Sequence, residues 1–471
     1  DLGFIAKIQN GVRGFKVMLG GGLGSQPRHA DELYGFLPSD KIIPVMEGVL
    51  RIFDRHGERR SRAKARIKFL IKDIGFDAFI KLVEDEHKAL SVTSFPINTT
   101  GFNNIIDVSL VEIPSVEIED QKAFEAWKLS NVIEQKQEGL SAIGIKVHLG
   151  DFYTDKARIL ADLIKNYAGN EIRLTLRQNI LIRHVKNELL PFFYIELQKL
   201  GFAEVGYNST LDITSCPGTD TCNLGIASST GISAELEKVL KTEYPQYANN
   251  KDITIKISGC MNSCGQHTMA HIGFQGMSIK SGNYVAPALQ VLLGGGVLGN
   301  GEGRIAAKVL KIPSKRGPQA LREILNDYQL NVKVDESFLD YYDRNGERYF
   351  YNLLKPLADT LNLKQSDFID WGNEVAYEKA VGVGECAGVV IDLIATLLLE
   401  SEEKIENAAE SLLLNQFSGS IYYAYSSIVN TAKALLISEG EKTNTHSGIV
   451  SQFEEVFASR INLELPFSEF I

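Results

Sequence analysis

The sequence predicts a mixed α+β fold in which a duplicated unit occupies about the first 330 residues and an all-α C-terminal domain follows. Two distant segments resemble each other, and short strand patterns alternate with helical ones around them. After about residue 331 the pattern is almost wholly helical. Period-two alternation of apolar residues indicates a strand, and apolar residues three and four apart indicate a helix.

The duplicated unit is visible as two pairs of similar strings. DLGFIAKI is followed by FKVMLGGGLG near the start, and HIGFQGMS is followed by LQVLLGGGVLG at 271–299. The second glycine run also matches the dinucleotide fingerprint GxGxxG, but no obvious amphipathic helix follows it. Packed turns, or a close approach of the backbone to a cofactor, explain these glycines better.

Helices and a connector are predicted between the two copies. Residues 42–90 are expected to form two helices separated by a turn around Gly57, because apolar residues recur there at helical spacing. Residues 91–138 contain Pro96 and Pro114 and are expected to be a connector.

A compact module is predicted from residue 139 onward. It begins with the alternating strand GIKVHL, continues with a helix around 155–167 and strands in EIRLTLRQNILIRHV, and ends in a helix at Gly201. The region 206–330 mixes strands such as DITIKIS with glycine-rich loops. Beyond it, long helices are predicted at 350–362, 388–400, 403–415 and 421–438.

Composition excludes several classes of protein. The chain has 471 residues, of which 44% are hydrophobic and 23% charged, as in an ordinary globular protein. Its net charge of -10 argues against a nucleic-acid-binding surface. No apolar run has the length of a membrane span, and 388–399, which contains Asp392, is expected to be a buried helix. Without an export signal or a disulfide scaffold, a cytoplasmic location is expected.

Four of the five cysteines are concentrated in two loops. Cys216 and Cys222 lie in TSCPGTDTCNLG, and Cys260 and Cys264 lie in KISGCMNSCGQ. Four thiolates from two loops suit an iron–sulfur cluster or a structural zinc ion, and the spacing alone also allows buried free cysteines. The fifth, Cys386, lies among small apolar residues and is expected to be buried and inert.

These two loops, in this order and at this separation, resemble the cluster signature of the siroheme-containing sulfite and nitrite reductases. The resemblance covers about residues 1–330. It implies two similar halves, each a ferredoxin-like module plus a siroheme half-domain. It also implies that Cys216, Cys222, Cys260 and Cys264 bind a [4Fe–4S] cluster, that the sulfur of Cys264 bridges to the siroheme iron, and that Asn262 contacts the siroheme.

The resemblance divides the chain into five regions. These are an incomplete first siroheme half-domain at 1–90, the connector at 91–138, a ferredoxin-like module at 139–205, a siroheme and [4Fe–4S] half-domain at 206–330, and a helical domain at 331–471. A docking or dimerisation role is expected for the helical domain. The resemblance also implies a further N-terminal segment of the same protein, which would supply the missing ferredoxin-like module.

Siroheme carries many carboxylates, so its pocket requires basic side chains. RLTLRQN is predicted to place Arg173, Thr175 and Arg177 on one face of a strand, where the family has a similar segment at its siroheme rim. We therefore expect Arg173, Arg177 and Asn179 to contact siroheme, against the alternative of a solvated strand face. Arg66 and Lys68 in RRSRAKARIKF resemble the family's basic helix start, although charge runs on helices are usually solvated.

The resemblance implies a six-electron reduction of sulfite to sulfide, with electrons from ferredoxin or a similar small donor. Nitrite reduction to ammonia is the alternative within the same class, and a zinc-stabilised structural or interaction protein is the alternative outside it. No catalytic residue is predicted. The family's substrate-binding arginines and lysines come mainly from a segment upstream of the position that corresponds to Asp1.

Overall fold

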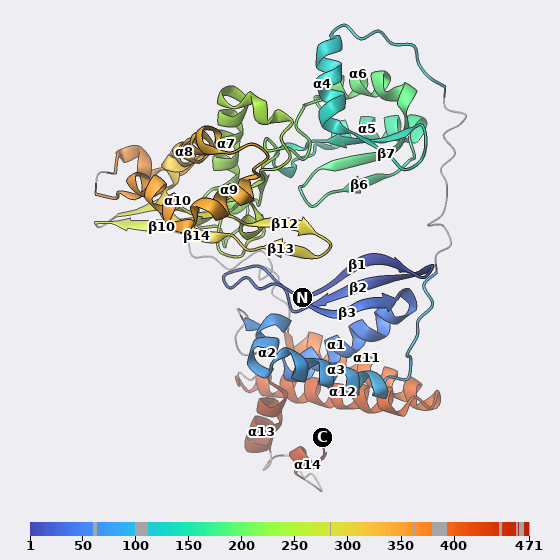
Figure 1. Ribbon diagram of the computed structural model, residues 1–471. Coiled ribbons are helices and arrows are strands. Elements are labelled where there is room, and N and C mark those ends of the chain that lie inside the picture. Colours follow the sequence, from blue (N-terminus) through green and yellow to red (C-terminus); the bar gives the residue numbers. More distant parts are fainter. Residues whose placement is uncertain are drawn as a thin grey trace. The chain divides into compact units, whose positions relative to one another are not determined.

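The computed structural model describes residues 1–59, 64–98, 112–282, 284–361, 363–378, 393–441, 445–457, 460 and 466–470. The chain forms two compact units (Figure 1). Unit 1 comprises residues 1–22, 28–100 and 387–471, and unit 2 comprises residues 23–27 and 101–386. Unit 1 therefore combines the first copy of the repeat with the last helices of the chain.

A three-stranded antiparallel sheet begins unit 1. Its strands β1 (Leu2–Gln9), β2 (Val12–Leu19) and β3 (Asp31–Pro38) lie side by side in sequence order. The β1–β2 hairpin turns at Asn10 and Gly11, whose φ angles are 51° and 76°. A two-residue hairpin loop favours positive φ at both positions, and Asn-Gly is the sequence that adopts it most readily.

In the part of 42–90 that the structure describes, three helices follow this sheet, where two were expected. They are α1 (Ile42–His56), α2 (Ile67–Ile74) and α3 (Phe76–Ala89). The prediction of a break after Gly57 is confirmed, but the second predicted helix is interrupted at Gly75. Gly75 has a φ of 88°, which lies outside the helical region and ends α2 before α3 begins.

The C-terminal helices of unit 1 are α11 (Leu393–Leu413), α12 (Phe417–Ser438), α13 (His446–Phe457) and α14 (Phe467–Phe470). The helices expected at 388–400 and 403–415 are one helix, α11, as far as the structure describes them. Leu398 and Leu399 of this helix are exposed, so the apolar run is not fully buried. Among the helices that the structure describes, none combines the length and the hydropathy of a membrane span.

The α12 helix packs on α1 within unit 1. Its Tyr422 ring lies 3.9 Å below the guanidinium of Arg51, which is 5% exposed. Arg51 also forms ion pairs with Glu47 of α1 and Glu86 of α3, at 2.5 and 3.2 Å. The same buried arginine therefore links three helices from distant parts of the sequence.

A ferredoxin-like module occupies the first part of unit 2. Its elements are α4 (Gln121–Asn131), β4 (Val132–Glu134), β5 (Leu140–Ile145), α5 (Thr154–Tyr167), β6 (Ile172–Leu174), β7 (Ile180–Lys186) and α6 (Leu190–Leu200). The antiparallel sheet has the order β4-β5-β7-β6. The module begins earlier than the expected boundary at 139, because Trp127 of α4 is fully buried in its core.

A second, larger sheet carries the second copy of the repeat. Its strands are β8 (Thr214–Ser215), β9 (Ile255–Ser258), β10 (Ile272–Ser281), β11 (Tyr284–Leu293) and β14 (Ala307–Pro313), in the order β14-β11-β10-β9-β8. The three repeat strands pair antiparallel, and β9 and β8 extend the sheet in parallel. The glycine run GGGVLG enters a small hairpin of β12 (Gly296–Gly299) and β13 (Glu302–Arg304), so no dinucleotide-binding helix follows it.

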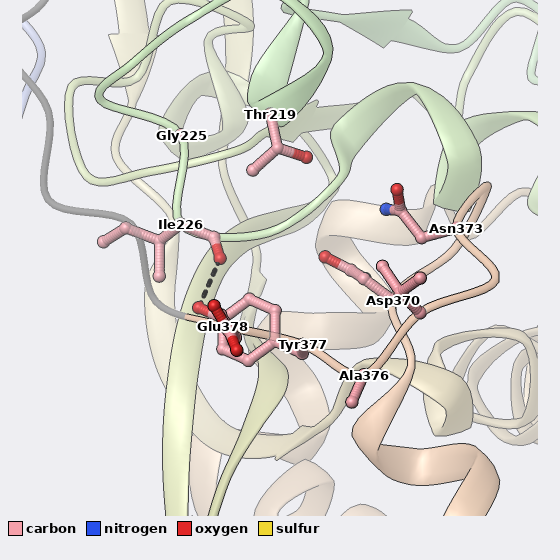
Figure 2. A pocket seen from close by; sticks show the side chains of 9 residues that line it. Thr219, Gly225, Ile226, Asp370, Asn373, Ala376, Tyr377 and Glu378 are labelled. Atoms are coloured by element: carbon pink, nitrogen blue, oxygen red, sulfur yellow. Dashed lines mark hydrogen bonds between the residues drawn. The ribbon is translucent and has the colours of Figure 1, made fainter.

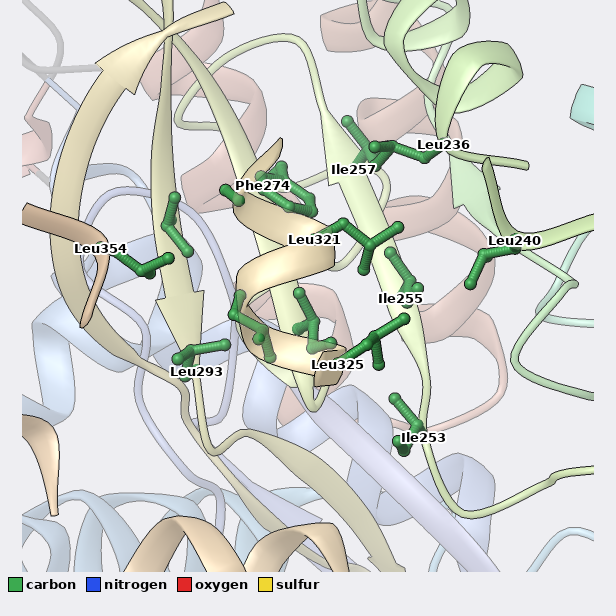
Figure 3. Close-up of a cluster of buried hydrophobic side chains, with 14 of the residues drawn as sticks. Leu236, Leu240, Ile253, Ile255, Ile257, Phe274, Leu293, Leu321, Leu325 and Leu354 are labelled. Atoms are coloured by element: carbon green, nitrogen blue, oxygen red, sulfur yellow. The ribbon is translucent and has the colours of Figure 1, made fainter. Parts of the chain in front are cut away.

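Four helices cover this sheet and close its core. They are α7 (Ser229–Glu243), α8 (Gly317–Asn331), α9 (Phe338–Asn345) and α10 (Glu347–Leu354). Figure 3 shows the core, in which Leu321 and Leu325 of α8 lie over Ile255, Ile257 and Phe274 of the sheet.

The region expected to form one helical domain, residues 331–471, is divided between the two units. Phe338 of α9 and Phe350 of α10 are fully buried in the core of unit 2, whereas α11 to α14 belong to unit 1. Helical periodicity predicts which face of a helix is apolar, but not which distant surface that face contacts.

Candidate metal centre

Two neighbouring parallel strands deliver the two cysteine loops to the same edge of the larger sheet. Thr214 of β8 pairs with Lys256 of β9. Cys216 directly follows β8, and Cys260 lies two residues beyond β9. Because the carboxyl ends of adjacent parallel strands lie at one edge, the two loops meet there.

The two loops are bonded to each other through their backbones. The amides of Ile226 and Ala227 donate to the carbonyl of Gly259 at 2.8 and 3.1 Å. The amide of Gly259 in turn donates to the sulfur of Cys216 at 3.2 Å. Such an N–H donor stabilises a thiolate, the form in which cysteine binds metal.

Glycines make this close approach possible. A Cβ atom on Gly259 would lie 2.7 Å from the Cα of Gly218, and one on Gly225 would lie 2.8 Å from the carbonyl carbon of Gly218. Gly218 itself has a φ of 54°. No larger residue fits at either contact without moving the backbone, so these glycines fix how the two cysteine loops lie against each other.

Cys260 is the most buried of the four cysteines. Burial raises the pKa of the Cys260 thiol, which is 8% exposed, and the backbone N–H of Asn262 opposes this shift. The charges of Cys216, Cys264 and Cys222 raise that pKa further. Cys216 and Cys222 are half-buried, and Cys264 is exposed.

The donor set fits an iron–sulfur cluster. Four cysteine thiolates are the usual ligands of a [4Fe–4S] cluster, and the two loops that carry them are in direct backbone contact. Within the residues that the structure describes, no three His, Cys, Asp or Glu side chains are placed to hold a single metal ion. The fit therefore rests on the chemistry of the four donors and on the loop contacts. Cys386 lies outside the described residues.

Arg173 and Arg177 do not share a strand face, so that prediction is wrong. Strand β6 ends at Leu174, and the chain then turns, with Gln178 at a φ of 66°. Arg173 is exposed and pairs with Glu171 at 3.2 Å. Side chains alternate between the two faces of a sheet only within a strand. Arg177 lies on the turn after β6, so its direction is not set by that of Arg173.

The turn directs Arg177 toward the start of the siroheme half-domain. Its guanidinium donates to the carbonyl of Asn208 at 2.8 Å, and burial lowers its pKa. Asn179 is fully buried, and its side-chain amide bonds protein atoms at both ends. It donates to Asp212 at 2.5 Å and accepts from the amide of Val147 at 2.9 Å.

Asn262 and the two basic residues of the first copy lie in different units. Asn262 is exposed beside Cys264 in unit 2. In unit 1, Arg66 pairs with Asp1 at 3.1 Å, and the ammonium of Lys68 lies 3.4 Å from the carbonyl of Gly22. Lys68 and Arg66 therefore lie beside the glycine run of the first copy.

Several buried charges of unit 2 were not predicted. Lys256 is 6% exposed and donates to Gln266 at 2.6 Å, and burial lowers its pKa to about 8. Burial also raises the pKa of Asp212 to about 6. Lys146, directly after β5, is likewise buried.

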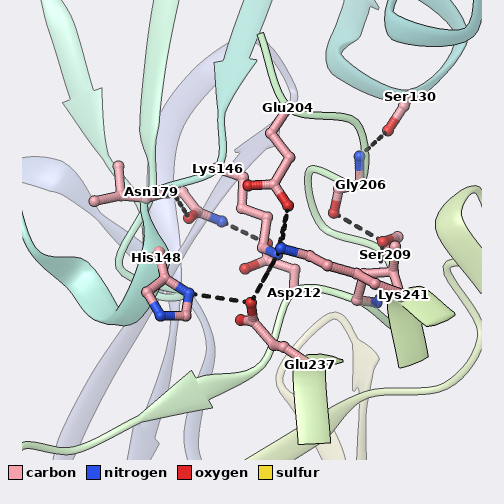
Figure 4. A network of polar contacts seen from close by, with 12 residues as sticks. Ser130, Lys146, His148, Asn179, Glu204, Gly206, Ser209, Asp212, Glu237 and Lys241 are labelled. Atoms are coloured by element: carbon pink, nitrogen blue, oxygen red, sulfur yellow. Dashed lines mark hydrogen bonds and ion pairs between the residues drawn. The ribbon is translucent and has the colours of Figure 1, made fainter. Parts of the chain in front are cut away.

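A polar network links the ferredoxin-like module to α7 (Figure 4). The ammonium of buried Lys146 lies 3.3 Å from a carboxylate oxygen of Glu237 and 3.6 Å from Glu204. His148 approaches the same oxygen of Glu237 at 3.0 Å, and Lys241 pairs with Glu204 at 2.6 Å. The hydrogen bond to Glu237 raises the pKa of His148. These contacts hold the module against the helix that follows the first cysteine loop.

Comparison with known proteins identifies both parts of this arrangement. Residues 1–90 and 206–356 match the family described as nitrite and sulphite reductase 4Fe-4S domain, and residues 133–200 match the nitrite/sulfite reductase ferredoxin-like half domain. The two stretches of the first match correspond to the two copies of the repeat. The glycine-tight cysteine loops lie within its second stretch.

Individual relatives and a solved structure agree. A ferredoxin–nitrite reductase of Synechococcus elongatus is 27% identical over 63% of this chain and 53% of its own length. A sulfite reductase [ferredoxin] of Mycolicibacterium paratuberculosis is 28% identical over 60% of this chain and 48% of its own length. The structure of the Mycobacterium tuberculosis NirA protein matches with a TM-score of 0.58 and 26% identity, over 74% of this chain and 61% of that one.

The chain spans about half the length of the curated relatives that it matches. The family match covers both copies of the repeat and the cysteine loops, and it confirms the predicted fold class. The chain belongs to the nitrite and sulphite reductase family, whose cofactors are siroheme and a [4Fe–4S] cluster.

Proposed function

We propose that this chain takes part in the six-electron reduction of sulfite to sulfide, with nitrite reduction to ammonia as the second candidate. The meeting of the two cysteine loops at one sheet edge is the observation that supports this function most directly. Relatives with nitrite reductase and sulfite reductase names are similarly close, so nitrite is equally supported as the substrate. Nothing supports the alternative of a zinc-stabilised structural protein.

Cys216, Cys222, Cys260 and Cys264 are the proposed ligands of the cluster, and Cys264 is the proposed bridge to the siroheme iron. The exposure of Cys264 supports this assignment, since a bridging sulfur must face a second cofactor. Asn262, exposed beside it, is the proposed siroheme contact within the same loop. When bound, the coupled cofactors supply electron transfer and an open iron position for the substrate anion.

Basic residues are proposed to neutralise the siroheme carboxylates. Arg177 is the strongest of them, because its guanidinium reaches the start of the siroheme half-domain at Asn208 and retains further N–H donors beside the one bound there. Arg173, Arg66 and Lys68 are also proposed to contact siroheme carboxylates. Asn179 is better placed to hold the Arg177 turn than to contact a cofactor, since both ends of its amide bond the protein.

Ferredoxin or a similar small protein is the proposed electron donor, in a cytoplasmic location. The names of the relatives support the donor, because they describe ferredoxin-dependent enzymes. No residue is assigned to the binding of the electron donor or of the substrate anion.

The optical spectrum and metal content of the purified protein test the proposal. We expect bound siroheme, iron and acid-labile sulfide, and steady-state reduction of at least one of the two anions with reduced ferredoxin or a dye as donor. Comparison of kcat/KM for sulfite and nitrite then decides the substrate. Stoichiometric zinc without acid-labile sulfide would contradict the proposal.

A further inference from the structure

A segment just beyond the family match crosses the first cysteine loop. The match to the 4Fe-4S domain ends at residue 356, and the chain then continues through residues 370–377, which we call the clamp. Figure 2 shows the clamp residues Asp370, Asn373, Ala376 and Tyr377 facing the loop at Thr219, Gly225 and Ile226.

The near end of the clamp is anchored at Asp370, which is 3% exposed. One carboxylate oxygen accepts from the amide of Ser228 at 2.7 Å. The other accepts from the amide of Trp371 at 2.9 Å and from the hydroxyl of Ser314 at 3.3 Å. Ser228 caps the helix α7, which begins directly after the first cysteine loop. The buried carboxylate of Asp370 therefore holds the point at which this loop enters α7.

Trp371 fixes the clamp to the body of unit 2. Its indole N–H donates to the carbonyl of Ser314 at 2.9 Å, and the ammonium of Lys315 lies 4.0 Å from its ring centroid. Its backbone lies so close to Gly231 that a Cβ there would be 2.7 Å from the carbonyl carbon of Trp371. The near end is therefore rigidly placed on α7.

The far end of the clamp reaches the junction of the two cysteine loops. The hydroxyl of Tyr377 donates to the carbonyl of Ile226 at 2.7 Å. The amide of that same Ile226 donates to Gly259, whose amide donates to the sulfur of Cys216. One hydrogen bond from Tyr377 therefore positions the residue that joins both loops.

The clamp and the loop do not pack continuously. A cavity of about 630 Å³ lies between them, lined by Thr219, Gly225 and Ile226 on one side and by residues 370, 373 and 375–378 on the other. At the two ends of the clamp, the hydrogen bonds of Asp370 and Tyr377 attach it to the residues that follow the first cysteine loop. Loss of the hydrogen bonds of either residue should therefore change the position of the loop more than it would if clamp and loop shared a continuous apolar contact.

We infer that the clamp is a positioning element for the iron–sulfur cluster, and that Tyr377 and Asp370 hold the two cysteine loops in the geometry that retains the cluster and sets its reduction potential. The inference rests on the proposed cluster ligands. It adds residues that lie outside the matched domain.

The test compares the full-length holoprotein with Tyr377→Phe and Asp370→Asn variants. Tyr284→Phe is the matched control, because Tyr284 belongs to the same unit and is 72% exposed. The first measurement is the rate at which an excess of iron chelator bleaches the cluster. The second is the midpoint potential of the cluster, obtained by a redox titration followed by electron paramagnetic resonance.

We expect Tyr377→Phe to lose its cluster about three- to tenfold faster than the wild type, the change that loss of one hydrogen bond produces. Asp370→Asn should lose it faster still, because three donors share that carboxylate. Both potentials should fall, because a misplaced Gly259 amide no longer stabilises the more negative reduced cluster. Tyr284→Phe should match the wild type.

Two results overturn the inference in distinguishable ways. If the wild type holds iron and sulfide but both variants bleach at its rate and keep its potential, the clamp has no positioning role and the proposed function stands. If the wild type itself holds no iron–sulfur cluster, the proposed function fails and the inference fails with it. A potential that rises in both variants also contradicts the inferred role of the Gly259 amide.

Discussion

The two copies of the repeat have the same local structure. Strands β1, β2 and β3 correspond to β10, β11 and β14, with Leu2 opposite Leu19 in the first copy and Ile272 opposite Leu293 in the second. The third strand of each ends in a proline, a short 3-10 helix and then a 15-residue α-helix, α1 or α8. The shared sequence pattern therefore specifies a hairpin, a third strand and a helix.

The copies differ at the outer edge of the first strand. In the sheet described for the first copy, β1 lies at the edge and is largely exposed or half-buried. In the second copy, β9 and β8 extend the sheet beyond β10, whose first five residues are buried. The cysteine loops follow these two added strands. The repeat thus supplies the framework, and the strands added to one copy carry the metal-binding chemistry.

The largest test of this comparison removes a cysteine that only the second copy has. Cys260→Ser should abolish the cluster, because a hydroxyl is a poor substitute for the thiolate ligands that iron–sulfur clusters require. Iron and acid-labile sulfide per chain measure the loss. Cys386→Ser serves as the control and should retain both, since that thiol is predicted to be inert. Normal iron and sulfide in Cys260→Ser would show that the cluster lies elsewhere.

A pair of equivalent glycines measures how differently the copies are packed. Gly20 and Gly294 follow the second strand and have φ angles of 78° and 79°. A Cβ on Gly294 would lie 2.3 Å from the ring of Tyr342, which is stacked on Phe350, whereas one on Gly20 would lie 2.5 Å from the terminal methyl of Ile71.

Gly294→Ala should therefore lower the free energy of unfolding by about 2–4 kcal/mol. Gly20→Ala should lower it by about 1–2 kcal/mol, since the Ile71 methyl can rotate away. Urea denaturation of each variant measures both values. Equal losses would mean that the backbone conformation, and not the packing of the second copy, dominates.

A third test asks whether cofactor contacts extend from the second copy into the ferredoxin-like module. Arg177→Ala should weaken siroheme retention by about 1.5–3 kcal/mol, the value of a hydrogen bond to a charged group. Arg177→Lys should recover only part of the siroheme retention, because a lysine ammonium cannot form a bidentate hydrogen bond with a carboxylate. Siroheme content after extended dialysis measures retention, with Arg13→Ala as the control, because Arg13 is an exposed residue of β2. Unchanged content would assign Arg177 to structure alone.

The smallest expected effect is a pH dependence of the polar network beside the second copy. Burial raises the pKa of Asp212 from 3.8 to about 6, while Lys146 and Arg177 partly oppose this shift. The folded state then binds more protons than the unfolded state between pH 4 and 6, so its stability falls as the pH rises through this range. The loss should be on the order of 1–2 kcal/mol.

His148 acts in the same direction. Its hydrogen bond to Glu237 raises its pKa above 6.5, so the stability that it contributes is complete below pH 6.5 and is lost as the pH rises through the folded pKa. Urea midpoints measured between pH 4 and 8 should fall with rising pH, and Asp212→Asn should flatten the part below pH 6. A wild-type midpoint that rises from pH 4 to 6 would contradict this account.

Much of the framework could be predicted from the sequence because it depends on local patterns. Alternating residues and the Asn10-Gly11 turn specify the first hairpin, and the spacing of the cysteine pairs in two glycine-rich loops indicates a metal site. These features are properties of short segments, whose conformation and ligand chemistry depend mainly on their own residues.

Only the tertiary structure decided which segments meet. The adjacency of β8 and β9 brings Cys216 to Cys260, the turn after Leu174 separates Arg177 from Arg173, and Asn179 is enclosed by Asp212 and the amide of Val147. Periodicity shows which face of a helix is buried but not its partner, so the division of 331–471 between two units was not predictable. Burial is a property of the whole fold, and it causes the raised pKa of Asp212. The contact of Tyr377 with Ile226 likewise joins residues that are distant in the sequence.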